Sequence, residues 1–336
     1  MASIRSLAAS LRLPPNANGD RLEELVRFAT LAANSHNTQP WRFVWSDGVL
    51  RLEADRARGC PVVDPDHHHV FVSVGAAAHA ACVAGPALGF EVSLIVEDEA
   101  IVASLREVET QEAPRLDALR ARMSTRAPFD PAPVDEATRV RLAEAASIED
   151  VTLRWIDGAE LAALTESLAE ATRAQARDAA FLHELRDWIR FSPTSALRTR
   201  DGLASEATGN PSAPDWIGRR VFRFAAGPGP LEKALRAQMA GTSAALVLCG
   251  PEDAPRGWMK VGRALQALLL EAEAAGLASA FVNQAIEVPT LRPAFERRFG
   301  VEGRRADVVL RLGEKPRGMT LAHSLRRPVS EVLVRR

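Results

Sequence analysis

The sequence predicts an α+β fold made of two related halves, each with helices packed against an antiparallel or mixed sheet. Two internal repeats support this prediction, and so does the length, because 336 residues exceed the usual size of one compact domain. The first half is assigned to residues 1–112 and the second half to residues 113–336. The second half also contains an insertion, which we expect to form a lid.

The clearer repeat is a buried helix followed by a glycine. Val74-Gly75 precedes an Ala-rich run that ends at Leu88-Gly89, and Val261-Gly262 precedes a similar run that ends at Ala275-Gly276. In both copies the two glycines have the same spacing, and apolar residues recur at helical intervals between them. Each run is followed by a strand-like segment, at residues 91–96 and 278–282, and residues 307–313 (DVVLRLG) alternate as a strand should. We therefore expect two equivalent helices, one in each half.

A second repeat lies upstream, where residues 25–35 (LVRFATLAANS) are similar to residues 137–147 (ATRVRLAEAAS). The two repeats have different offsets, so the second half carries about 75 extra residues between Trp155 and Val261. Residues 160–190 are predicted to form one long amphipathic helix that leads into this insertion. Residues 191–230 are rich in Ser, Thr, Pro and Gly, which predicts a loop that covers the structure as a lid. Chance similarity between Ala-rich helices is the alternative explanation of both repeats.

Composition narrows the classes of function. The chain has 47% hydrophobic and 25% charged residues with a formal net charge of -1, as expected of a globular protein without a nucleic-acid partner. Its three cysteines are isolated from one another, which favours a reducing, cytoplasmic compartment. No apolar run is long enough to span a membrane, and the first residues lack the pattern of an export signal. The sequence thus predicts a cytoplasmic protein with no membrane partner.

The segment Ala-Ala-Asn-Ser-His-Asn-Thr-Gln-Pro-Trp-Arg-Phe at residues 32–43 is the most informative motif. A predicted helix ends there, and small polar residues precede an extended Gln-Pro-Trp-Arg run. The segment resembles the signature of the FMN-binding nitroreductase superfamily. The resemblance implies an α/β/α sandwich, and it implies that Ser35, Asn37 and Gln39 contact a flavin across an interface. The alternative is that these residues only cap the helix end.

Two further segments resemble the same family. Arg122, Ser124 and Arg126 match its R-x-S-x-R pattern, which implies a phosphate contact from Arg122 and positive charge near the flavin ring from Arg126. A solvated Arg-rich junction between a helix and a loop is the alternative. Near the C-terminus, Arg326 and Arg327 match a basic motif that closes over the FMN phosphate in relatives, and the sequence does not decide between them.

Weaker assignments complete the predicted cofactor site. Asn283 and Gln284 follow the second repeated helix, at a position where the family contacts the flavin edge. Arg190 falls where relatives have a ribityl or ring contact, although a surface arginine fits equally well. His36 lies inside the signature turn. No catalytic side chain is expected, because in this family the flavin carries the chemistry.

The repeat also predicts the stoichiometry. The segment equivalent to Arg122–Arg126 in the first half is residues 10–14 (SLRLP), and the segment equivalent to the polar turn in the second half is residues 147–151 (SIEDV). Both have lost the pattern. One polar turn and one Arg-Ser-Arg segment remain, so we expect one FMN per chain and a monomer that mimics the family's homodimer. The fused architecture with a lid is similar to the Acg-type branch.

Other readings of the sequence were weaker. The run His67-His68-His69 after Asp66 suggests a metal site, but consecutive side chains diverge on a helix or strand and cannot all reach one ion, so no metal is predicted. There is no G-x-G-x-x-G, Walker-type or G-x-S-x-G motif.

The resemblance to the nitroreductase superfamily implies an FMN-dependent oxidoreductase that passes hydride from a small-molecule reductant such as NAD(P)H to an acceptor such as a nitroaromatic or a quinone. The alternatives are a lidded protein that sequesters FMN with little turnover and a cofactor-free interaction protein.

Overall fold

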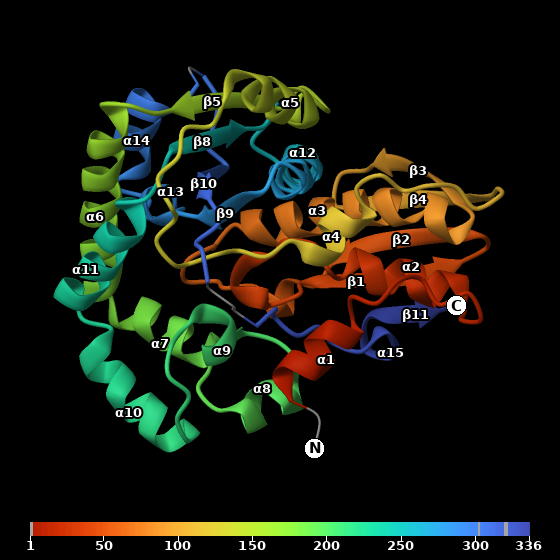
Figure 1. The fold of residues 1–336 in the computed structure, drawn as a ribbon, viewed down its shortest axis with the longest axis horizontal. Helices are drawn as coiled ribbons and strands as arrows, with labels where there is room; N and C mark the ends of the chain where they lie inside the picture. Colours follow the sequence, from red (N-terminus) through yellow and green to blue (C-terminus); the bar gives the residue numbers. More distant parts are fainter. Residues whose placement is uncertain (1–2, 302, 319–321) are drawn as a thin grey trace.

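The protein contains a mixed five-stranded sheet and an antiparallel four-stranded sheet, separated by two long helices (Figure 1). The computed structural model describes residues 3–301, 303–318 and 322–336. The predicted α+β class is confirmed. The first sheet has the order β11-β1-β2-β4-β3, with strands Leu333–Arg335, Trp41–Ser46, Val49–Ala54, Ala100–Glu107 and Phe90–Val96. The second sheet has the order β5-β8-β10-β9, with strands Thr152–Ile156, Ala244–Cys249, Val308–Glu314 and Leu277–Phe281.

The two sheets share one connectivity. In each, the first, second, fourth and third strands of the half lie side by side and pair antiparallel. A long helix follows the second strand in both, namely α3 (His68–Ala84) and α12 (Pro255–Ala274). A shorter helix precedes the first strand in both, namely α2 (Arg21–Ala29) and α5 (Glu136–Ala146). This agreement supports the internal repeat seen in the sequence.

The repeated glycines lie where α3 crosses α12. A Cβ atom placed on Gly75 would lie 1.9 Å from the carbonyl oxygen of Met259, and one placed on Gly262 would lie 1.9 Å from the carbonyl oxygen of Val72. Each glycine thus packs against the backbone three residues before the other glycine, as expected for two equivalent helices related by an approximate twofold axis. Only glycine allows backbones to approach this closely.

The ends of the two helices differ from the prediction in one copy. Gly89 and Gly276 both adopt positive φ, of 73° and 76°. However, α3 stops at Ala84, and a short 3-10 turn (Pro86–Leu88) precedes Gly89. Pro86 explains the early end, because proline cannot continue an α-helix hydrogen-bond ladder.

The second sheet is covered on both faces. Leu246 and Leu248 of β8 pack into the core between the two sheets, whereas Val247 and Cys249 pack into a second core on the opposite face. This alternation is that of a strand, whose successive side chains point to opposite faces. The second core is closed by α6 (Glu160–Arg177) and α11 (Pro228–Met239), which belong to the insertion.

The insertion connects β5 to β8, at the position where a two-residue turn connects β1 to β2 in the first half. The predicted single helix over residues 160–190 is wrong. It is two helices, α6 and α7 (Ala179–Trp188), separated at Asp178, whose carboxylate accepts from the Ala180 N–H at 2.8 Å. The predicted loop at 191–230 is also wrong, because this part is largely helical. It contains α8 (Pro193–Thr199), α9 (Ser205–Thr208), α10 (Asp215–Ala225) and β7 (Leu203–Ala204), which pairs in parallel with β6 (Ile189–Arg190) just before this segment.

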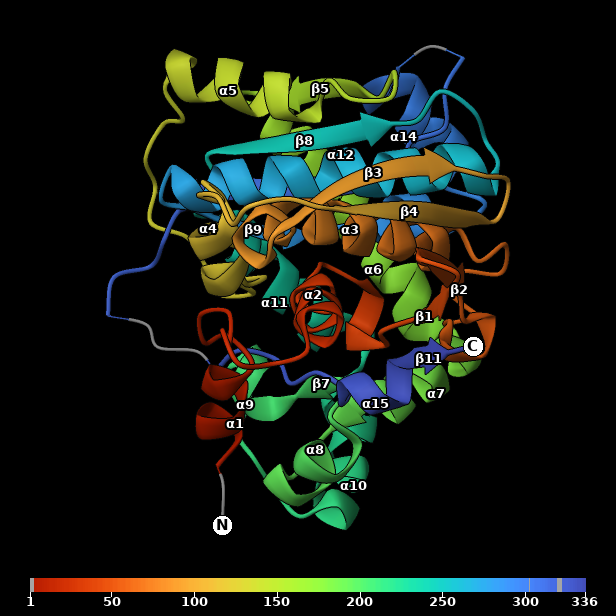
Figure 2. The ribbon, with the colours of Figure 1, turned by 90° about the vertical axis from the view of Figure 1, so that its right-hand side faces the viewer.

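The N-terminal helix packs against the insertion, and the C-terminal strand joins the first sheet (Figure 2). After β10 the chain crosses to the first sheet, where β11 pairs in parallel with β1, so the final strand joins the half opposite to the one that the sequence division assigned to it. Helix α1 (Ile4–Ser10) packs against the insertion through Ile4 and Ala8. The remaining helices are α4 (Leu116–Ala121), α13 (Gln284–Glu287), α14 (Arg292–Phe299) and α15 (Val329–Val332). Among the described helices, none has the length and apolar character needed to cross a bilayer.

Candidate functional site

A cavity of about 420 Å³ lies between the two halves and the insertion. This volume is within the range of small-molecule and cofactor sites. Most of the residues predicted to bind a cofactor line it, although they come from distant parts of the sequence: Ser35, Asn37, Arg122, Ser124, Arg126, Asn283, Gln284 and Arg326. Gln39, Arg190 and Arg327 are not among the lining residues.

The polar turn at residues 35–39 is held in an unusual backbone conformation. His36, Asn37 and Gln39 all have positive φ, of 46°, 54° and 55°. Such values are uncommon outside glycine and are stabilised by local polar contacts. Here the side chain of Asn34 accepts from the Gln39 N–H at 3.0 Å. The turn therefore has a fixed shape that presents Ser35 and Asn37 to the cavity.

Asn37 joins three segments of the chain. Its amide nitrogen donates to the carbonyl oxygens of Gly202, in the insertion, and Leu325, near the C-terminus, at 3.1 and 3.2 Å. Its amide oxygen accepts from Arg326 at 2.9 Å. This buried side chain thus ties the first half, the insertion and the C-terminal segment together at the cavity wall.

Arg326 is buried and its guanidinium is already occupied. It donates to the carbonyl oxygens at the end of α2, those of Thr30, Leu31 and Ala32, as well as to Asn37. A cation at this position satisfies the unpaired carbonyls of a helix C-terminus. Arg326 therefore stabilises the cavity wall, because its N–H donors bind protein oxygens.

The three predicted residues outside the cavity also have protein partners. The Gln39 side chain accepts from the Arg327 backbone N–H at 2.8 Å, and the Arg327 guanidinium lies 3.2 Å from Glu331. Arg190 donates to Asp201 at 2.7 Å and to Thr199 at 2.9 Å. These contacts hold the C-terminal segment and the insertion in place.

Two buried arginines, Arg12 and Arg122, and the ring of His323 gather at one end of the cavity. Arg122 is buried, and its Nε and Nη1 have no partner within the described part of the chain. The same is true of Arg12 Nε and His323 Nδ1. Burial, with the charges of neighbouring arginines, lowers the pKa of Arg12 to about 9 and that of His323 to about 3, and burial lowers that of Arg122 to about 10. Unpaired buried cations are costly, so this end of the cavity is suited to an anion.

Arg12 and His323 were not predicted from the sequence. Arg12 lies in the SLRLP segment, which had lost the R-x-S-x-R pattern, and it follows a helix that belongs to neither repeat. His323 is one of several scattered histidines. No local signal identified either residue, because long-range packing of both chain ends brings them to Arg122.

The Arg122–Arg126 segment is anchored beside β9. The Thr125 N–H donates to the Ser279 carbonyl oxygen at 2.9 Å. Arg311, which is fully buried, donates to the carbonyl oxygens of Thr125 and Ala127 at 3.0 and 2.8 Å. These contacts direct Ser124 and Arg126 toward the cavity. Arg311 lies in a predicted strand, and nothing in its sequence context indicated this anchoring role.

The far end of the cavity contains a charged pair. His69 Nε2 lies 3.6 Å from Glu287 Oε1, and Gln175 donates to the other oxygen of Glu287 at 2.9 Å. Burial opposes the charged form of both groups, but the contact between them raises the pKa of His69 and lowers that of Glu287. Each side chain therefore favours the charged form of the other, and the pair can orient a polar ligand.

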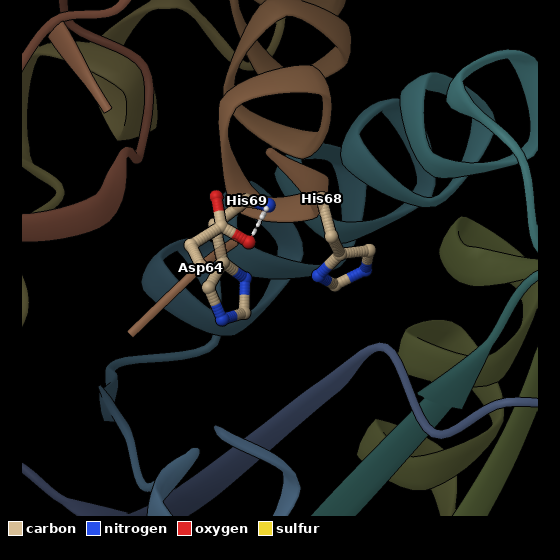
Figure 3. A group of neighbouring side chains, drawn as sticks. All are labelled: Asp64, His68 and His69. Carbon is tan, nitrogen blue, oxygen red and sulfur yellow. Dashed lines mark hydrogen bonds between the residues drawn. The ribbon is translucent and has the colours of Figure 1, made fainter. Parts of the chain in front are cut away.

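His68 and His69 also approach Asp64 (Figure 3). Their rings are 4.7 Å apart, so two of the three consecutive histidines do converge, whereas His67 precedes α3 with a φ of 60°. Both oxygens of Asp64 accept from the His69 backbone N–H at 3.0 Å, and His68 Nε2 lies 2.9 Å from Asp307. We interpret this group as a hydrogen-bonded cap at the start of α3.

Buried histidines predict a loss of stability in acid. Burial lowers the pKa of His36 and His79 to about 4 and, together with nearby arginines, that of His323 to about 3. The unfolded chain therefore binds protons that the folded chain does not, below the unperturbed pKa of about 6.5. We expect the free energy of unfolding to fall as the pH decreases from about 6.5 to about 4, as measured by urea denaturation. His323→Asn should reduce this slope, whereas His183→Asn, at a side chain 65% exposed, should not.

Comparisons with known proteins agree with these observations. No family model matches the sequence. Two curated proteins from Mycobacterium tuberculosis, strains CDC 1551 and H37Rv, are each 26% identical over 338 residues, covering 94% of this chain and 92% of their own length; both are provisionally named NAD(P)H nitroreductases. A nitroreductase with bound FMN from Bacteroides fragilis (16% identical, TM-score 0.40) covers 64% of this chain and 96% of its own. The FMN-dependent nitroreductase NfnB of Mycobacterium smegmatis, in complex with NADPH (19%, TM-score 0.41), covers 64% and 94%. The two structural similarities are too weak to carry weight, but sequence similarity over nearly the whole length of both curated relatives supports placing the chain in the nitroreductase superfamily.

Proposed function

We propose that the chain binds one FMN in the cavity between its halves and acts as an NAD(P)H oxidoreductase of the nitroreductase type. The observation that supports this most directly is the pair of buried arginines, Arg12 and Arg122, at one end of the cavity. Together with His323, whose lowered pKa keeps it neutral, they leave four nitrogen atoms without partners in the described part of the chain. A phosphate monoester provides negative charge and several acceptor oxygens, which match these groups.

The remaining residues fit the rest of the cofactor. Arg122 and Arg12 would hold the phosphate, with Ser124 beside them. Arg126, half-buried in the same wall, would place positive charge near the ring and favour a reduced, anionic flavin. Asn283 and Gln284 would contact the ring edge, and the Gln284 side-chain oxygen is buried without a partner. When bound, FMN supplies the chemistry, accepting hydride and passing electrons to an oxidised acceptor.

The protein's own contribution is to position the cofactor and substrates and to enclose them in the cavity. The Asn37 amide holds the polar turn, the insertion and the C-terminal segment in one arrangement. The pair of His69 and Glu287 orients polar groups at the far end. Apolar side chains of the insertion, including Phe181, Leu185 and Ile189, exclude water from one wall.

This apolar wall also favours a second function, in which the insertion acts as a lid and sequesters FMN with little turnover. We infer that the halves divide near residue 112, between β4 and α4, and that the chain is a monomer with a single asymmetric site, as in the Acg-type branch. The single site follows because Arg122 and the polar turn each lie on one half only.

The visible spectrum of the purified protein tests the proposal. We expect an FMN-like absorption band and one FMN per chain, bleached by NAD(P)H faster than free FMN and restored by a nitroaromatic or a quinone. Flavin that is bound but is reduced no faster than free FMN would support sequestration. A colourless chain that does not take up added FMN would contradict both functions.

A further inference from the structure

Helix α10 exposes nearly all of its surface. Of its 11 residues only Gly218 is buried. Trp216, Val221 and Phe224 are 72%, 54% and 78% exposed. At 100° per residue, these three side chains spread over about 140° of the exposed side of the helix, and Arg220 lies between Trp216 and Phe224 on the same side. Large apolar side chains clustered on an exposed face mark an interaction site, whereas single ones do not.

The opposite side of α10 fixes its orientation. Gly218 packs directly against the Phe191 ring, and the rings of Phe222 and Phe191 are 6.2 Å apart. Asp215, at the start of the helix, accepts from Ser192 and Ser195 at 3.1 and 3.0 Å. Both views of the ribbon place α10 at the outer end of the insertion, away from the two sheets (Figures 1 and 2). The apolar face is therefore held toward the outside.

The charges on this helix are almost all positive. Arg219, Arg220 and Arg223 are exposed, and the last two form no ion pair with any residue that the structure describes. Arg219 lies 3.5 Å from the carboxylate of Asp187. The same carboxylate also lies 3.3 Å from His183 and 3.6 Å from Arg186, so Arg219 shares it with two other side chains. A cationic surface on a chain with a formal net charge of -1 is a local feature and does not follow from overall composition.

We propose that α10 docks the protein on an anionic lipid surface and lies in the plane of the headgroups. A helix with aromatic residues on one face, arginines around them and low net hydrophobicity is suited to this environment. Trp216, Val221 and Phe224 would enter the boundary between headgroups and acyl chains. Arg220 and Arg223 would pair with lipid phosphates.

Charge complementarity favours lipid over a second copy of the chain. A symmetric dimer through α10 would place the same arginines opposite one another, because a twofold interface uses the same surface on both subunits. Docking of this kind requires no membrane-spanning segment. It departs from the expectation of no membrane partner, which rested on the absence of a long apolar run.

Vesicle co-sedimentation of the full chain tests the proposal. We expect binding to vesicles of phosphatidylcholine mixed with phosphatidylglycerol, weaker binding at high salt, and little binding to phosphatidylcholine alone. Arg220→Glu/Arg223→Glu and Trp216→Ser/Phe224→Ser should each weaken binding by roughly tenfold or more. The matched controls should bind normally: Arg297→Glu/Arg298→Glu reverses two exposed arginines on α14, and Ile95→Ser removes a side chain 63% exposed on β3.

Two outcomes would overturn this assignment. One is a wild-type chain that stays in the supernatant with anionic vesicles at low salt. The other is binding that the α10 variants and the control variants lose equally. Sedimentation velocity without lipid adds a separate test, because self-association that Trp216→Ser/Phe224→Ser abolishes would assign the face to a second copy. Circular dichroism should show that all variants retain the wild-type fold.

Discussion

Replacing Arg122 by alanine is expected to weaken FMN binding by about 1.5–3 kcal/mol, which corresponds to roughly 10- to 150-fold in Kd. The reason is the state of its guanidinium, whose Nε and Nη1 are buried and lack partners, while Nη2 lies 3.5 Å from a backbone carbonyl. Among the arginines that the sequence left as alternatives, Arg326 uses its donors on α2 and Asn37, and Arg327 pairs with Glu331. Quenching of FMN fluorescence measures the affinity.

Riboflavin, which lacks the phosphate, separates a phosphate contact from a general loss of packing. The effect of Arg122→Ala should largely disappear with riboflavin. Arg122→Met, which keeps most of the side-chain volume, should lose as much FMN affinity as the alanine variant. Arg327→Ala should bind FMN like the wild type. An unchanged FMN affinity in Arg122→Ala would show that the phosphate binds in another part of the cavity.

The same variant should not destabilise the protein without cofactor. The charge of Arg122 helps to lower the pKa of Arg12, and the charges of Arg12 and Arg122 help to lower the pKa of Arg326, because like charges repel. Removing one buried charge that lacks a counter-ion relieves this repulsion. We therefore expect apo Arg122→Ala to be at least as resistant to urea as the apo wild type, so that affinity and stability change in opposite directions. Sites that hold charged ligands often show this trade-off.

Features of the fold that could be predicted from the sequence are those encoded by local patterns. Gly75 and Gly262 marked equivalent helices because close helix crossing requires glycine, and the equivalence is visible in the structure. The strands at 91–96, 278–282 and 307–313 followed from alternating or continuous apolar runs and are observed as β3, β9 and β10. The sequence predicted about 75 extra residues between Trp155 and Val261, and the helices of the long segment between β5 and β8 were missed because Ser, Pro and Gly there start or end short helices. Pro193 and Pro228 begin α8 and α11.

Only some residues of the candidate site could be predicted from the sequence. Asn37 and Arg122 lie in recognisable motifs, and both line the cavity. Arg12 and His323 could not be found, since each depends on a chain end returning across the molecule. Arg190 was selected by position alone, and its partner Asp201 belongs to the insertion, for which the sequence offered no equivalent segment.

Gly75→Ala is expected to cost at least as much stability as the upper end of the ~1–3 kcal/mol that is typical of overpacking. The new methyl group would lie 1.9 Å from the Met259 carbonyl oxygen and 2.7 Å from its carbonyl carbon. Backbone atoms cannot rotate away as a side chain does, so α3 and α12 must separate, and buried contacts on both helices are lost. Gly262→Ala should have a similar effect, because its methyl group would meet the Val72 carbonyl oxygen at the equivalent distance.

The double variant distinguishes this crossing from two unrelated clashes. Helices that have already separated to accept one methyl group leave room for the second, so the two costs should sum to more than the cost of the double variant. Gly229→Ala is the matched control, since nothing lies within 4 Å of its added Cβ, and it should change stability by less than about 1 kcal/mol. Urea denaturation gives all four values. Because Val72 and Ser73 of α3 and Leu265 of α12 line the cavity, separation of the helices should also weaken FMN binding. Two results would contradict a close crossing of α3 and α12, through which the two halves form one site. One is a single variant as stable as the wild type, and the other is a double variant whose loss of stability equals the sum of the two single losses.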